Sequence, residues 1–346
     1  MAPWLCRAPV IGAAAFAMAL AACAADAQSL DQDKVKALYA AAKKEGQVII
    51  WGTQRREVEW IPAAFGKLFP GIDVQFLGDN DIAVKAIAEA RAGRHQVDVY
   101  QNSLTGTLPL IQRDLPANVD WSPFGIDKRN IAFDGKMAYT SNIVYTVAYN
   151  NKLAKDTDAP KNWIDILDER YKGKGASSTF LLPRLVGALG LAWGDDKALQ
   201  FARDIVAKTN LLLTRAPRES LLQSGERVYA FGEIDSLIRA VAAEGLPVSQ
   251  VVPQPVVVGQ FGATIMKNAP HPNAALLLAG FLAGPEGKAA RLQATSQADY
   301  GPTSDNEFAK TLHSGGMQVV WDRPDNMAAR EALFGRAAAI LTGQSR

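Results

Sequence analysis

Residues 267–287, KNAPHPNAALLLAGFLAGPEG, decide the fold of this chain. A Pro-His-Pro turn leads into a run of alanine and leucine, and Pro272 suits the first turn of a helix because its φ is already close to the helical value. The Gly-Pro pair at 284–285 then ends the helix. An apolar approach rich in β-branched residues covers 256–266. The stretch therefore predicts a buried strand, a proline turn and a helix in succession.

The region that begins near residue 35 alternates between amphipathic segments and short apolar runs. Its amphipathic segments have apolar residues three or four positions apart, as at Val58, Ile61 and Phe65. This alternation predicts parallel strands with helices on both faces of the sheet, and ligands of such sheets bind beyond the carboxyl ends of the strands. We expect helices at 35–45, 58–69 and 82–91, strands at 48–51, 72–77 and 97–100, and strand-end loops at 52–57, 78–81 and 101–105.

A long β-rich segment at 137–149, MAYTSNIVYTVAY, separates this region from a second set of strands and helices. The same apolar spacing predicts the second set, and a further helix is expected near 327–341. The second set comprises strands at 175–178, 211–214 and 228–231 and helices at 183–193, 218–223 and 235–244.

The stretch at 267–287 resembles the element that follows the second hinge crossing in solute-binding proteins of ABC importers. The cluster it resembles includes the ferric-ion, hexose-phosphate and aminoethylphosphonate receptors. The resemblance implies an α/β protein of the type II periplasmic binding fold, with two α/β lobes joined by a two-stranded hinge at 137–149 and 256–261. The expected domains are lobe 1 at 28–140 plus 262–300, lobe 2 at 141–261, and a C-terminal helical segment at 301–346 that packs across the lobes.

The N-terminus is typical of a secretory leader. Its apolar run at 8–22 follows a single charge and is too short to span a bilayer. Two ends fit: a signal peptide of 1–27 with cleavage before Gln28, or one of 1–22 with a lipid anchor on Cys23. The only other cysteine, Cys6, lies inside the leader, so a chain that starts at Gln28 has no cysteine chemistry. We expect a periplasmic protein, either free or tethered through Cys23.

Composition limits the classes of partner. The formal net charge is +2, and acidic and basic residues are interspersed along the chain. The sequence therefore has no cluster of basic residues of the kind that binds nucleic acid. Removal of 27 residues from 346 leaves 319, enough for two domains of about 100–200 residues each. We expect a monomer with no nucleic-acid partner and no cofactor.

Enzyme motifs are missing from the sequence. It contains no GxSxG, HExxH or P-loop pattern, and its histidines have no metal-site spacing. The paired carboxylates at Asp195 and Asp196 are expected on a surface connection. We therefore expect a binding protein, with a ligand sensor that serves no transporter and an exported enzyme as the alternatives from other classes. A neighbouring pair of permease and ATPase genes distinguishes a transport receptor from a sensor.

The resemblance also implies where a ferric ion would be held. Ferric receptors of that cluster use a histidine in the first loop, a glutamate after the third strand and adjacent tyrosines at the start of a second-lobe helix. The matching positions hold Arg55, Ser103 and the Asp235-Ser236 pair. Fe³⁺ prefers anionic oxygen donors, and a guanidinium opposes a bound cation. We expect no metal site, with ferric-ion and polyamine- or thiamine-type binding as the alternatives within the family.

The strand-end loops carry groups that suit an anion instead. Arg55 lies in the first loop, Arg184 lies in a helix that follows three hydroxyl residues, and Arg215 lies beside another helix start. Hydroxyl and N–H groups at a helix start bind anions, although any single arginine is explained as well by surface charge. Glu233 and Asp235 suit either a cationic group or the dipole of their own helix. The predicted ligand-binding residues are Thr53, Gln54, Arg55, Ser103, Ser177, Ser178, Thr179, Arg184, Arg215, Glu233 and Asp235.

Together these patterns predict an extracytoplasmic substrate-binding protein. It would capture a small polar, anionic organic solute, such as a phosphonate, a phosphorylated compound or a carboxylate. It would then deliver this solute to an inner-membrane ABC permease.

Overall fold

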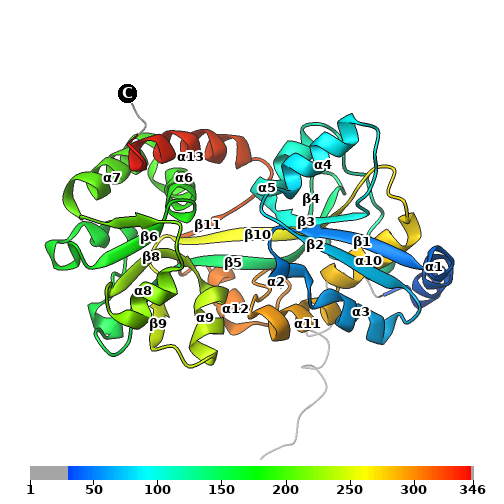
Figure 1. Cartoon of the computed structure of the whole chain (residues 1–346), viewed down its shortest axis with the longest axis horizontal. Helices are drawn as coiled ribbons and strands as arrows, with labels where there is room; N and C mark the ends of the chain where they lie inside the picture. Colours follow the sequence, from blue (N-terminus) through cyan, green and yellow to red (C-terminus); the bar gives the residue numbers. More distant parts are fainter. Residues whose placement is uncertain (1–29, 344–346) are drawn as a thin grey trace, which may run out of the picture.

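One mixed sheet runs through the whole molecule (Figure 1). The computed structural model describes residues 30–343, so the predicted leader and the anchor at Cys23 lie outside the described residues. The main path of the sheet has the order β2-β1-β3-β10-β5-β8-β6-β7, with β4 and β9 paired to β5 and β11 paired to β10. The strands are β1 (Gln47–Gly52), β2 (Asp73–Gly78), β3 (Val99–Ser103), β4 (Ile131–Ala132), β5 (Met137–Asn150), β6 (Gly175–Ser178), β7 (Leu212–Thr214), β8 (Tyr229–Ile234), β9 (Val248–Val251), β10 (Val256–Ile265) and β11 (Val319–Trp321).

Helices pack on the sheet as the strand–helix alternation predicted. Most of them connect two neighbouring parallel strands, as α2 and α3 do between β1 and β2. The helices are α1 (Gln32–Glu45), α2 (Arg55–Val58), α3 (Ile61–Leu68), α4 (Ile82–Arg91), α5 (Leu104–Ile111), α6 (Leu181–Trp193), α7 (Asp195–Lys208), α8 (Arg218–Ser224), α9 (Asp235–Ala243), α10 (Pro272–Ala283), α11 (Pro285–Thr295), α12 (Glu307–His313) and α13 (Met327–Leu341). No helix in the described part of the chain is both long and apolar enough to cross a membrane.

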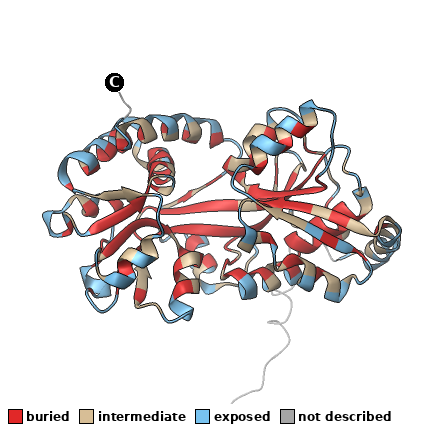
Figure 2. Cartoon of the chain, viewed as in Figure 1, coloured by how far each residue is buried: buried red, intermediate tan, exposed pale blue. Residues whose placement is uncertain are grey.

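Two long strands belong to both halves of the sheet. The first half of β5 pairs with β10, from Ala138 to Val144, and its second half pairs with β8, from Tyr145 to Tyr149. Every residue of β5 is buried, and Figure 2 shows both strands as buried along the middle of the molecule. We call the half with β1, β2 and β3 lobe 1 and the half with β6, β7 and β8 lobe 2. Each lobe has its own large apolar core.

Residues 267–287 form the proline turn, helix α10 and the start of α11, and α10 lies in the core of lobe 1. Its first N–H groups are satisfied by a carboxylate from another helix, because Glu45 accepts from the backbone of Asn273 (3.1 Å) and Ala274 (2.7 Å). The His271 backbone N–H is held by Asp98 at 2.7 Å. A Cβ at Gly280 would lie 2.2 Å from the ring of Phe124, so only glycine permits this close approach.

Some predicted elements differ from the structure. The helix expected at 58–69 begins later, as α3, because Pro62 in its first turn has no N–H to continue a helix from Val58. The loop expected at 52–57 contains α2, and the one expected at 101–105 is the end of β3 and the start of α5. The connection expected at Asp195 and Asp196 is instead the first turn of α7. Acidic side chains there stabilise the positive end of the helix dipole, which a surface-loop interpretation overlooked.

The C-terminal segment contacts both lobes. Strand β11 pairs with β10, and the first turn of α13 is anchored by a buried ion pair between Arg330 and Asp322. Met327, at the start of α13, packs in an apolar cluster with Leu104 of α5. Leu333, further along α13, packs in the core of lobe 2. In Figure 1 the helix accordingly extends along lobe 2 with its first turn beside α5.

Replacement of Leu278 by alanine should lower the free energy of unfolding by about 2–5 kcal/mol, because the substitution opens a cavity in the core of lobe 1. Leu292→Ala is the matched control, since Leu292 is 47% exposed on the neighbouring helix α11 and its loss should cost about 0.5 kcal/mol or less. Urea denaturation followed by circular dichroism measures both changes. Equal losses in the two variants would contradict the assigned core.

Candidate functional site

The carboxyl ends of strands from the two lobes converge on the middle of β5. Strand β3 ends at Ser103, which lies opposite Phe261 of β10, and Phe261 in turn lies opposite Ser141 of β5. From the other lobe, β8 ends at Ile234, which lies opposite Tyr145. Because β3 and β8 run in opposite directions through this shared sheet, their ends point toward each other.

Helix starts gather at the same place, because each helix begins directly after its strand. Helix α5 begins after β3, α6 after β6 and α9 after β8. Ser103 caps α5 by accepting from the Gly106 N–H at 3.1 Å, and Ser178 caps α6 by accepting from Phe180 and Leu181 at 3.1 and 3.2 Å. Helix N-termini carry partial positive charge, so this region favours an anion.

One side chain crosses directly from lobe 2 to lobe 1 at this point. The Nη1 of Arg184, on α6, donates to the Thr105 hydroxyl of α5 at 3.3 Å, and Thr105 Oγ1 lies 3.1 Å from Ser103 Oγ. The guanidinium lies 4.4 Å from the ring centroid of Phe180 and 4.7 Å from that of Phe334. These two contacts fix the plane of the guanidinium.

Arg184 keeps most of its hydrogen-bonding capacity. Its side chain is 20% exposed, its Nε is buried without a partner, and its Nη2 makes no hydrogen bond among residues 30–343. The contact from Nη1 to Glu331 Oε1 of α13 is long, at 3.5 Å. A guanidinium with fixed orientation and free N–H donors is suited to bind a carboxylate or phosphate in a bidentate manner.

The predicted serines and threonine of lobe 2 lie at this site, but two of their hydroxyls serve the fold. Ser177 donates to the Phe231 carbonyl at 2.6 Å, and Ser178 caps α6 as described above. Thr179 is partly exposed, with its backbone N–H bound to the carbonyl of Thr214 at 3.2 Å. Thr179 therefore has the freest hydroxyl of the three.

The two predicted acidic residues are buried and paired. Glu233 receives two hydrogen bonds from Arg218, at 2.7 and 3.0 Å, and burial raises the pKa of its carboxyl while Arg218 opposes the shift. Asp235 accepts from the Val144 N–H at 2.8 Å, from Arg239 at 2.7 Å and from the Tyr300 hydroxyl at 2.8 Å. Both carboxylates thus have strong partners within the protein.

The first-loop residues and Arg215 are not brought to Arg184. The Arg55 side chain is 74% exposed, and its Nε donates to Glu59 at 2.8 Å, one helical turn away. Gln54 and Arg215 are exposed, and Thr53 is partly buried. Of the three predicted arginines, only Arg184 contacts both lobes.

A buried arginine that sequence reasoning missed fixes the first loop against β3. Arg291, on α11, is fully buried, donates to Gln101 Oε1 at 2.8 Å and lies 3.6 Å from the carboxylate of Glu57. Burial lowers the pKa of Arg291 to about 10 and raises the pKa of Glu57. An arginine in a polar helical segment has the sequence pattern of a surface residue, so only the packing reveals this role.

The described residues contain no cluster for a metal. No group of three or more His, Cys, Asp or Glu side chains within residues 30–343 could hold an ion. Asp235, which the resemblance aligns with the iron-binding tyrosines, already accepts hydrogen bonds from three donors. The one anionic oxygen donor that the sequence placed at these positions is therefore engaged within the protein.

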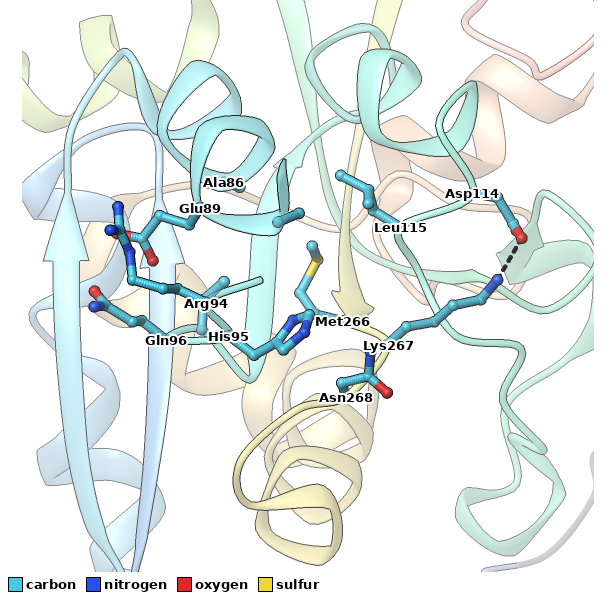
Figure 3. Close-up of a pocket in the computed structure, with 12 residues that line it drawn as sticks. Ala86, Glu89, Arg94, His95, Gln96, Asp114, Leu115, Met266, Lys267 and Asn268 are labelled. Carbon is cyan, nitrogen blue, oxygen red and sulfur yellow. Dashed lines mark hydrogen bonds and ion pairs between the residues drawn. The ribbon is translucent and has the colours of Figure 1, made fainter. Parts of the chain in front are cut away.

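A cavity of about 220 Å³ lies elsewhere, within lobe 1 (Figure 3). Its rim includes the ion pair between Lys267 and Asp114. The Asp114 carboxylate is also paired with Lys136 at 2.7 Å, and these two lysines lower its pKa to about 2. None of the predicted ligand-binding residues lines the cavity. We place the candidate site at the strand ends, because Arg184 of lobe 2 and Thr105 of lobe 1 meet there beside the starts of α5 and α6.

Comparisons with known proteins agree with this architecture. A family model described as bacterial extracellular solute-binding protein matches residues 52–289, more than half of the chain. Iron-bound HitA from Pseudomonas aeruginosa is similar with a TM-score of 0.71 at 17% identity, over 85% of this chain and 99% of HitA. A substrate-binding protein of an ABC transporter from Agrobacterium tumefaciens gives 0.72 at 14% identity, over 85% and 94% of the two chains. One from Bradyrhizobium japonicum USDA 110 gives 0.70 at 18%, over 86% and 99%.

At these identities the similarity shows the fold alone, and it confirms the predicted type II periplasmic binding architecture. No curated protein sequence matches the chain.

Ferric citrate should leave the purified protein colourless and unbound, because the matching positions offer one anionic oxygen donor that is already paired. Absorption spectroscopy checks for a tyrosinate–Fe³⁺ band, and equilibrium dialysis measures bound iron. Stoichiometric, tight retention of iron would contradict the assignment, with or without colour.

Proposed function

Because the chain belongs to the family of bacterial extracellular solute-binding proteins, we propose that it captures a small anionic organic solute and delivers it to an ABC permease. The solute is a phosphorylated compound, a phosphonate or a carboxylate. The family is one of transport proteins, not of enzymes. The protein works in the periplasm as a monomer, either free or tethered through Cys23.

The observation that carries the proposal is the position of Arg184. Its guanidinium is oriented by two aromatic rings, has an Nη2 that makes no hydrogen bond among residues 30–343, and lies between the starts of α5 and α6. The orientation is set before a solute arrives, so less rotamer entropy is lost on binding. The positively charged Arg184 guanidinium, beside two helix N-termini, favours an anion over a cation or a neutral sugar.

Binding at this place couples to movement of the lobes. Arg184 belongs to lobe 2 and Thr105 to lobe 1, so an anion that contacts both favours the arrangement in which the lobes are close. Only such a difference in affinity between the open and closed forms can drive closure. β5 and β10 are the strands about which the lobes rotate.

Ferric ion is the alternative cargo, because iron-bound HitA is among the similar structures. The charge of Arg184 and the full pairing of Asp235 argue against it. The same guanidinium argues against polyamine and thiamine cations. A thermal-shift screen with ethyl phosphate, sugar phosphates, alkyl phosphonates, carboxylates, spermidine, thiamine and ferric citrate separates these classes. Stabilisation by the cations alone would overturn the proposal.

Replacement of Arg184 by methionine should weaken anion binding by roughly 10- to 150-fold, which corresponds to the loss of a charge-assisted hydrogen bond of about 1.5–3 kcal/mol. Arg203→Met is the matched control, because Arg203 is exposed on α7 in the same lobe and away from the strand ends. Titration calorimetry with the tightest compound of the screen measures both. Arg55→Ala tests the first loop in the same way, and a larger loss there than at Arg184 would move the anion contact to that loop.

A further inference from the structure

Helix α13 is held in a fixed register against α6. A Cβ at Gly187 of α6 would lie 3.0 Å from the Arg330 carbonyl and 3.2 Å from the backbone nitrogen of Phe334. The two backbones therefore pack closely because Gly187 has no side chain. The buried ion pair between Arg330 and Asp322 fixes the start of the same helix, and Arg336 pairs with Asp195 of α7 at 2.8 Å. These contacts set which side chains α13 presents toward α6.

Two of those side chains lie at the anion site. Glu331 and Phe334 are three residues apart, which places them on one face of α13. Phe334 packs on the Arg184 guanidinium, and Glu331 Oε1 lies 3.5 Å from its Nη1. The Glu331 side chain is 31% exposed and makes no other hydrogen bond among residues 30–343. Its carboxylate therefore has free acceptor capacity beside the group that receives the solute.

A carboxylate in this place affects which anions are accepted. An anion bound to Arg184 comes close to the Glu331 charge and is repelled by it, whereas a cationic group on the same solute is attracted. Selectivity commonly arises from such a repulsive element set beside an attractive one. In a solute with an anionic and a cationic group close together, the anionic group can pair with Arg184 while the cationic group pairs with Glu331.

We propose that α13 forms one wall of the solute site and that Glu331 recognises a cationic amino group, so that the solute is a short zwitterion. The inference rests on the proposed function, because it takes Arg184 as the anion-binding group. It adds a specificity-determining residue from the C-terminal helix, which the strand-end loops alone do not provide.

Matched pairs of small solutes test the proposal, because each pair differs only by an amino group. The pairs are phosphoethanolamine with ethyl phosphate, taurine with ethanesulfonate and β-alanine with propionate. Calorimetry on the wild-type protein should show that the amino member of the best-bound pair binds at least about fivefold more tightly. Glu331→Gln should remove that preference, and Glu331→Lys should reverse it in favour of the plain anion. Glu307→Gln, at an exposed glutamate of α12, should leave the preference unchanged.

The outcomes separate the two proposals. If plain anions bind through Arg184 but the amino group adds nothing, the zwitterion inference is wrong and the anion-receptor function stands. If Glu331→Gln tightens both members of a pair equally, Glu331 merely competes for Arg184 and the inference is again wrong. If no member of any pair binds but a sugar phosphate of the screen does, the zwitterion inference is wrong and the anion-receptor function stands. If no anion of the pairs or of the screen binds the wild-type protein, both proposals fall.

Discussion

The structure depends on two strands that each belong to both lobes. β5 changes partner from β10 to β8 between Val144 and Tyr145, and the backbone at that change is held by Asp235. Asp235 is also bound by Tyr300 and by Arg239, which in turn donates to the Ser296 carbonyl at 2.6 Å. The point at which β5 passes from one lobe to the other is therefore held by a buried carboxylate and three donors, and a carboxylate so fully paired has little capacity left for a solute.

β5 and β10 also determine where groups from the two lobes come together. Their pairing brings the ends of β3 and β8 to the middle of β5, and the helices that follow start there. Arg184 of lobe 2 and Thr105 of lobe 1 meet at this place, and α13 adds Phe334 and Glu331. A solute bound beside Arg184 and Thr105 would therefore contact both lobes at once.

Sequence patterns predicted the parts of the molecule that depend on residues close together in the sequence. The proline turn before α10, the long apolar run of β5 and the arginine on α6 were all recognisable from spacing and composition. The roles of Arg291 and Glu331 were not, because each depends on elements far apart in the sequence that meet only after folding. The hydroxyl of Ser178 was correctly located at a helix start, but its use as a helix cap depends on a rotamer that the sequence does not specify.

The absence of native cysteine from a chain that begins at Gln28 allows a direct test of lobe closure. Spin labels on cysteines at Leu68 of α3 and Val206 of α7, both exposed, report the distance between the lobes by double electron–electron resonance. Labels at Leu68 and Val84, both on lobe 1, give the control distance. Saturation with the tightest compound of the anion screen should shorten the distance between the lobes and leave the control unchanged. An unchanged distance between the lobes at saturation would contradict the account.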